Sequence, residues 1–149
     1  MEKRFFSAII TFCLLILGTA RAFAQMPGIP ETANIPFDFM IRGKTLPAGR
    51  YEVTVLNNND LYTLCVRSMD HSGIAAIVNS EPVIKHGGFR QSAFIFHRYG
   101  DTYFLDEITE KGEDVARELI PSRQERNLER QVARNDRVPK AEVVTVAAN

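Results

Sequence analysis

The chain has 149 residues, with 18 lysines and arginines against 18 aspartates and glutamates, so its formal net charge is zero. This balance excludes a general attraction to polyanions, and nucleic acid is accordingly not an expected partner. A chain of this length forms about one domain and buries a sizeable apolar core.

The first residues have the pattern of a cleaved export signal. A basic start precedes an apolar run over residues 5–17, and small residues ending at Ala24 follow. The apolar run is shorter than the roughly 20 residues that a helix needs to cross a bilayer. The sequence therefore predicts a signal peptide over residues 1–24, with Ala22 as the weaker cleavage site. It also predicts a periplasmic or extracellular protein that keeps no transmembrane anchor.

Two strands joined by a turn are expected next. The stretch "IPFDFMI" places Phe37, Phe39 and Ile41 on one face, and "RYEVTVLN" alternates apolar and polar side chains in the same way. Between them, "LPAG" has proline and glycine at positions that a type I turn favours. We interpret "KTLPAGRYEV", residues 44–53, as a turn that aims the second strand, because this geometry explains it without a binding role.

Further strands are expected in "LYTLCVRS", "GIAAIVN", "SAFIFHRY" and "TYFLDEIT", and less clearly in "VARELI". The turn signals "NNND", "DHSG" and "GD" separate them at short intervals. Short strands with regular turns are typical of antiparallel sheets, so residues 25–120 are predicted to form an all-β sandwich or partly closed barrel. An eight-stranded outer-membrane barrel fits less well because the strands are short.

One hairpin can be predicted with its register. If Gly100 and Asp101 form a two-residue loop, the facing pairs are Tyr99 with Thr102, Arg98 with Tyr103, His97 with Phe104, and Phe96 with Leu105. Simple alternation then places Phe94 and Ile108 on opposite faces of this hairpin. Both faces are largely apolar, so a second sheet should cover one, and the C-terminal segment or a partner the other.

Residues 121–149 predict a helix and a flexible tail. Ser122 and Glu125 have the spacing of a capping box, and the helix can continue to about Asn135. Arginines at spacings of three and four stripe the face opposite Leu128 and Val132. They offer a contact for an anionic surface, the alternative being an ordinary solvated face: Arg123, Arg126, Arg130, Arg134 and Arg137. The final apolar residues can add an edge strand or stay disordered.

The remaining reactive side chains form no motif. His71, His86 and His97 are not spaced as metal ligands, and the alternative is a metal site formed by His86, His97 and an acid from distant parts of the chain. Cys65 would be the one cysteine left after signal cleavage, which excludes an internal disulfide, and burial as a small apolar residue is expected for it. The sequence therefore predicts no catalytic, cofactor-binding or metal-binding residues.

Three stretches carry a resemblance. "IPFDFMIRGKTLPAGRYEV", "FHRYGDTYFLDEI" and "RELIPSRQER" together resemble a group of small exported bacterial proteins with no established activity. The likeness covers residues 35–129. It implies export and a β-rich fold, and brings no active site with it.

These observations favour an exported, non-catalytic binding module associated with the cell envelope, its partner an envelope protein or an anionic surface. One alternative is a carrier whose aromatic residues enclose a small apolar molecule: Phe37, Phe39, Phe94, Phe96 and Phe104. A packed core is the simpler use of these side chains. The other alternative is a hydrolase assembled from His97 and nearby acids.

Overall fold

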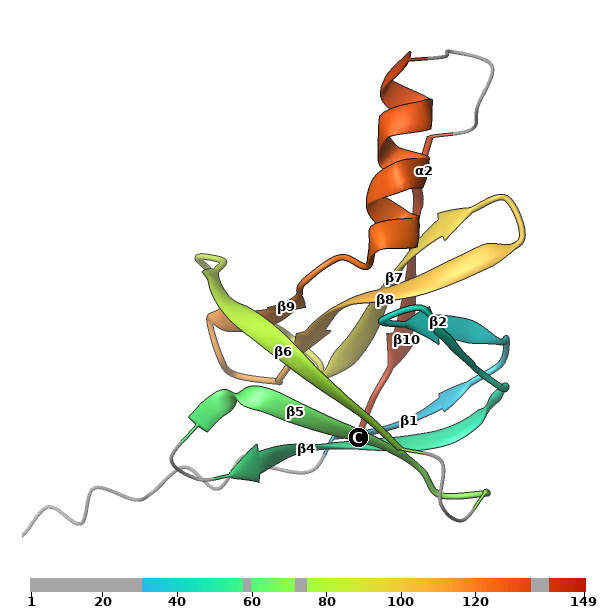
Figure 1. Ribbon diagram of the computed structural model, residues 1–149. Helices are drawn as coiled ribbons and strands as arrows, with labels where there is room; N and C mark the ends of the chain where they lie inside the picture. The colour runs from blue at the N-terminus through green and yellow to red at the C-terminus, as the bar shows by residue number, and fades with distance from the viewer. Residues whose placement is uncertain (1–30, 58–59, 72–74, 135–139) are drawn as a thin grey trace, which may run out of the picture.

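The structure is a computed structural model that describes residues 31–57, 60–71, 75–134 and 140–149 (Figure 1). Its strands are β1 (Glu31–Ile35), β2 (Phe39–Ile41), β3 (Lys44–Leu46), β4 (Gly49–Asn57), β5 (Asp60–Ser68), β6 (Ala75–Ile84), β7 (Ala93–Tyr99), β8 (Thr102–Thr109), β9 (Val115–Leu119) and β10 (Glu142–Ala147). The helix α2 (Arg123–Arg134) projects beyond the end of the sheet (Figure 1). Within the described residues the fold is thus mostly β with one helix near the C-terminus, as predicted.

The strands belong to one strongly curved, mainly antiparallel sheet. Its path runs β1-β4-β5-β6-β9-β8, then continues through β7 to β10, while the β2–β3 hairpin branches from β8 through a single parallel pairing. The two ends of this path meet at one bridge between Ala33 and Ala148, beside paired backbone hydrogen bonds between Thr32 and Asn149. We call this contact the seam. Because the seam is a single bridge and not a ladder, the sheet is only partly closed.

The alternation read from the sequence places the apolar face of each strand inside. In β4, Tyr51 and Val53 are buried, while Glu52 and Thr54, which alternate with them, are more exposed. Aromatic rings fill the interior. Phe39 lies edge-on to Tyr51 at 5.0 Å and to Phe96 at 5.5 Å between ring centroids. Such edge-to-face contacts add to the stabilisation from apolar burial.

The expected first strand is interrupted. Pro36 separates β1 from β2, and a turn at Arg42 and Gly43, missing from the sequence prediction, returns the chain as β3. Both turn residues have positive φ, 48° and 80°, as a two-residue type I′ hairpin turn requires. Type I′ turns usually have asparagine, aspartate or glycine at the first of these positions, so the sequence with arginine there did not predict the turn.

The stretch "LPAG" connects strands, although between β3 and β4 rather than directly from Phe37. Pro47 and Ala48 form a bend in which the Ala48 amide donates to Asp38 Oδ1 at 2.8 Å. The Tyr51 hydroxyl donates to the Pro47 carbonyl oxygen at 2.7 Å. The bend before β4 is therefore held by one side chain before it, Asp38, and by one from β4 itself, Tyr51.

The β7–β8 hairpin confirms the predicted register from Tyr99 opposite Thr102 to Phe96 opposite Leu105. The register then shifts, because Ile95 faces Glu107 and Asp106 is left as the extra residue of a β-bulge. The bulge reverses the alternation beyond it, so Ile108 faces Phe94 in the core. The prediction that Ile108 lies on the opposite face was therefore wrong.

The C-terminal residues belong to the sheet. Of the two alternatives for the tail, the structure shows the edge strand, since β10 pairs with β7 along its length, from Glu142 opposite Arg98 to Ala147 opposite Ala93. The expected flexible tail is corrected to this extent. The predicted signal peptide lies outside the described residues. No helix among the described residues is long and apolar enough to span a membrane.

An ion pair between Lys85 and the buried Glu107 is expected to stabilise the sheet. Lys85 Nζ contacts Glu107 Oε2, and the Glu107 side chain is almost fully buried, with its Oε1 lacking a hydrogen-bond partner. Lys85→Met should lower the free energy of unfolding by about 2 kcal/mol, below the usual cost of breaking a buried pair because Lys85 is half-exposed. Lys85→Met with Glu107→Gln should recover most of that loss in urea denaturation. An unchanged Lys85→Met protein would contradict the stabilising role of the pair.

Candidate functional site

A pocket of about 520 Å³ lies where the β2–β3 turn, β6, the end of β9 and the start of α2 meet. This volume falls within the range of small-molecule sites in proteins. We call it the α2 pocket. Its walls come from segments far apart in the sequence, so no local motif marks it.

The floor of the α2 pocket is apolar. Val78, Phe104, Leu105 and Leu119 are all buried residues of the sheet and line it. Ile120, half-exposed at the same place, extends this surface toward the rim. A floor of this kind favours contact with an apolar group, because water leaves both surfaces when they meet.

The rim is basic. Arg123 and Arg126 from the start of α2 and Arg42 from the β2–β3 turn line the pocket and are exposed. Arg126 donates to the Pro121 carbonyl oxygen, and Arg42 Nη1 donates to the Ile77 carbonyl oxygen at 3.5 Å. These bonds hold both side chains at the rim, where guanidinium groups suit carboxylate or phosphate oxygens.

The predicted arginine stripe is therefore divided. Arg123 and Arg126 belong to the α2 pocket, whereas Arg130 donates to the Arg126 carbonyl oxygen and to Asn127 Oδ1 farther along the helix. Arg134 is exposed in the last turn, and Arg137 lies outside the described residues. The stripe alone did not predict the pocket, because Arg42 comes from a different part of the chain.

Arg42 occupies a backbone conformation that is unfavourable for its residue type. Its φ of 48° lies in the left-handed region, where a side chain beyond glycine costs about 1 kcal/mol or more. Residues held in such conformations gather at functional sites, where the surrounding structure enforces them. The position of Arg42 on the rim fits that pattern.

The start of α2 contributes backbone polarity. The Glu125 amide donates to Ser122 Oγ at 3.1 Å, which confirms the serine half of the predicted capping box. The pocket is lined by Ser122 to Arg126, so the positive end of the helix dipole faces it. Glu125 does not use its Oε1 for capping, and this oxygen has no hydrogen-bond partner among the described residues.

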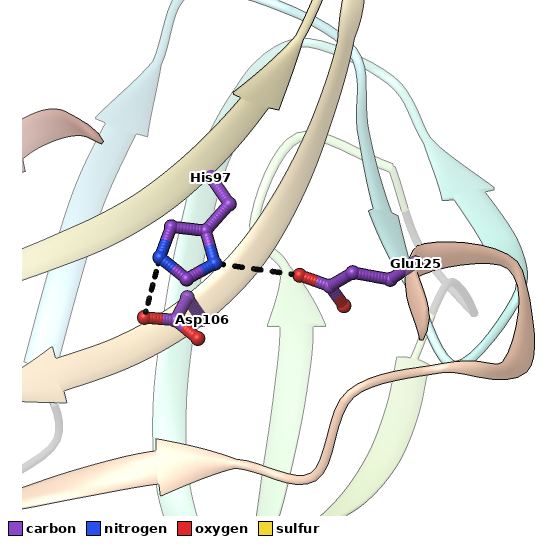
Figure 2. Close-up of side chains that lie close together, drawn as sticks. All are labelled: His97, Asp106 and Glu125. Atoms are coloured by element: carbon purple, nitrogen blue, oxygen red, sulfur yellow. Dashed lines mark ion pairs between the residues drawn. The ribbon is translucent and has the colours of Figure 1, made fainter. Parts of the chain in front are cut away.

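Behind the pocket wall, His97 lies between two carboxylates (Figure 2). His97 Nε2 is 3.4 Å from Asp106 Oδ2, and His97 Nδ1 is 3.6 Å from Glu125 Oε1. The Glu125 side chain is only 5% exposed and the Asp106 side chain 13%. The bulge in β8 places Asp106 at the ring, and the first turn of α2 places Glu125 there. We call these three residues the histidine cluster.

The charges in the histidine cluster depend on one another. The Glu125 carboxylate, together with the charge of Asp106, raises the pKa of His97 above its ordinary value, against the opposing effect of burial. Burial raises the pKa of Asp106 to about 6, although the charge of His97 opposes this shift. The two carboxylates therefore both favour the protonated form of the imidazole over the neutral form.

This arrangement fits a proton better than a metal ion. One ligand atom from each residue lies within 4.8 Å of the others, so the cluster has the residue types of a metal site. The ligands of a metal ion must point to one centre. Here Asp106 lies at His97 Nε2 and Glu125 lies at His97 Nδ1, on opposite sides of the ring (Figure 2). An imidazolium has a proton to donate on each of those nitrogens.

The residues named for the hydrolase alternative, His97 and nearby acids, come together in the histidine cluster. Among the described residues, no hydrogen bond joins His97 to a hydroxyl or a thiol, as a mechanism with a serine, threonine or cysteine nucleophile needs. His71 and His86 are exposed elsewhere. Cys65 is a free, half-buried cysteine and not a fully buried one as expected.

The aromatic residues of the carrier alternative do not line one chamber. Phe37 stacks on Tyr103 with ring centroids 3.9 Å apart and lies edge-on to Phe96. Phe39, Phe94 and Phe96 are fully buried in the core. Phe104, on the other face of β8, is the member of this set that lines the α2 pocket. Sequence reasoning identified the residues without separating core from pocket.

Comparisons with known proteins give this site no precedent. Models of protein families, the curated proteins and the solved structures were searched, and none matches this chain. The site is therefore described by its own geometry: an apolar floor, a rim of three arginines, and a histidine cluster of which Glu125 lines the pocket while His97 and Asp106 lie behind it.

Proposed function

We propose that this chain is an exported, non-catalytic binding protein whose α2 pocket takes a small organic acid with an apolar body. The single observation that carries this proposal is the pairing of a buried apolar floor with a rim of three arginines in one 520 Å³ pocket. The apolar body would lie on the floor, and the acid group would contact the guanidinium groups of Arg42, Arg123 and Arg126.

Two features of the chain support a binding role over catalysis. The histidine cluster has no hydroxyl or thiol bonded to it among the described residues, and its carboxylates are committed to the imidazole. The pocket combines a buried apolar floor with polar and charged groups that can orient a ligand, as binding sites for small molecules do.

Export is part of the same proposal. It rests on the basic start, short apolar run and small residues ending at Ala24, and on the resemblance described above. A periplasmic or extracellular protein with this pocket would meet small acids outside the inner membrane. Association with an envelope protein would then use surfaces other than the pocket.

The test is calorimetric titration of the mature protein at pH 6.5 with three probes. Octanoate has both an acid group and an apolar chain, octanol has the chain without the charge, and acetate has the charge without the chain. We expect octanoate to bind more tightly than either, since floor and rim are used together. Equal affinity for octanoate and octanol would remove the role of the arginines.

Matched arginine variants locate the site. Arg123→Gln with Arg126→Gln should weaken octanoate binding about tenfold or more, because two guanidinium groups leave the rim. Arg130→Gln with Arg134→Gln removes the same charge from the same helix outside the pocket and should leave the affinity nearly unchanged. Equal losses in both pairs would indicate a diffuse anionic-surface contact along α2 instead of the pocket.

Arg42→Asn separates binding from folding. Asparagine tolerates the left-handed backbone at this position better than arginine does, so the variant should be as stable as the parent or slightly more so. Its octanoate affinity should nevertheless fall severalfold. A variant that binds normally would exclude Arg42 from the site.

A further inference from the structure

The wall of the α2 pocket contains a group that opposes the proposed ligand. Glu125 lines the pocket at the same helix start that provides Arg123 and Arg126. An ionised carboxylate that is 5% exposed is weakly screened by solvent and repels an approaching anion. A pocket for organic acids therefore needs this charge to be neutralised.

His97 is placed to neutralise it. Its Nδ1 lies 3.6 Å from Glu125 Oε1, and both atoms are buried and without a hydrogen-bond partner among the described residues. Figure 2 shows the Glu125 side chain pointing at the ring from the helix start, with the ring held from its other side by Asp106. A proton on His97 gives the carboxylate a counter-charge that no other described ion pair of Glu125 provides.

We infer that His97 is a positioning residue for the pocket and that its proton controls the affinity for organic acids through Glu125. This inference rests on the proposed function and adds a means of regulation to it. With His97 protonated, Glu125 is paired and the rim presents net positive charge to the ligand. When His97 loses its proton, Glu125 becomes an unpaired anion in the pocket wall, and organic acids are released.

The residues around His97 come from five elements. Asp106 on β8 contacts the ring, and Glu118 on β9 acts on Asp106 in turn. Helix α2 contributes Glu125 and, one turn later, Glu129. On β7 itself the Tyr99 ring lies edge-on at 6.5 Å, and its pKa is raised to about 12, so it stays neutral over the relevant range. On β10, the residue opposite His97 is the uncharged Val143.

The direction of the pH effect follows from these groups. Glu125 raises the pKa of His97 above 6.5, so the protonated form predominates at lower pH and is lost as the pH rises through the raised value. Asp106, with a pKa of about 6, is ionised through most of this window and adds no opposing step above pH 7. Affinity for an organic acid should therefore fall between pH 6.5 and pH 9.

The experiment repeats the octanoate and octanol titrations with the full mature chain from pH 6.5 to pH 9. Octanoate itself stays ionised over this range. We expect its dissociation constant to rise about tenfold with pH, while that of octanol stays constant. Glu125→Gln should bind octanoate tightly at every pH, since the group that repels the ligand is gone. His97→Gln should bind it weakly at every pH.

Asp101→Asn is the control: its carboxylate is fully exposed in the β7–β8 turn and is not among the groups that act on His97, so this variant should keep the pH dependence of the parent. A second measurement does not require ligand: NMR titration of the His97 ring should give a raised pKa that falls in Glu125→Gln. This measurement confirms or contradicts the link between the two residues even in a variant with altered stability.

The outcomes separate the two proposals. If octanoate does not bind at any pH, the proposed function fails. If octanoate binds with the same affinity from pH 6.5 to pH 9, or if Glu125→Gln keeps the full pH dependence, the function stands and this inference is wrong. Zinc sulfate provides one more test. If one equivalent of zinc raises the Tm of the parent and not that of His97→Gln, the cluster holds a metal ion and this inference is wrong.

Discussion

Replacing Phe96 with alanine is expected to lower the free energy of unfolding by about 3 to 5 kcal/mol. The Phe96 side chain is fully buried, and its ring contacts Phe37 at 5.1 Å and Phe39 at 5.5 Å between centroids. Removing the Phe96 ring leaves a cavity, because the neighbouring rings are fixed to different parts of the sheet and cannot move in to fill it. Urea denaturation followed by circular dichroism measures the loss.

Two controls accompany this prediction. Phe96→Leu keeps most of the volume and should cost clearly less than alanine does. Val143→Ala on β10, where the side chain is 66% exposed, should change stability by less than about 0.5 kcal/mol. If Phe96→Ala cost no more than Val143→Ala, the aromatic core described here would be wrong.

The second large effect is expected at His97. His97→Ala should lower the free energy of unfolding by about 2 to 3 kcal/mol at pH 6.5, because Glu125 and Asp106 then lose the cation that separates them. Since the pKa of His97 is raised in the folded protein, its stabilisation is complete below 6.5 and is lost at higher pH. The difference between the two proteins should therefore shrink by pH 9.

A double-mutant cycle isolates the contact. Glu125→Gln removes one buried charge, and in that background His97→Ala should cost about 1 kcal/mol or less. Urea midpoints for the four proteins at pH 6.5 and pH 9 give the coupling free energy. Additive losses at pH 6.5 would show that His97 and Glu125 act independently.

Local sequence rules account for most of the strands. Period-two alternation predicted the faces of β4, and the "GD" turn predicted four facing pairs of the β7–β8 hairpin correctly. These features depend on residues close in sequence. The prediction failed at Ile108, because a bulge changes the alternation through a single extra residue that no side-chain pattern announces.

The candidate site was less accessible to sequence reasoning. The arginine stripe was visible at helical spacing, but the contribution of Arg42 depends on a turn that sequence rules assign to asparagine or glycine. Glu125 was predicted as a capping residue, and its Oε1 instead faces His97. That contact requires the bulge, the hairpin and the helix start to be placed together, so it is a property of the tertiary fold.

The seam between β1 and β10 has a consequence for the folding pathway. Its hydrogen bond from Thr32 Oγ1 to the Asn149 carbonyl oxygen joins residues 117 positions apart, a far longer chain closure than the hairpins need. Contacts of such sequence separation form slowly, so we expect the seam to close after the hairpins. Until then β1 and β10 are open sheet edges, and the chain is most exposed to pairing with another copy of itself.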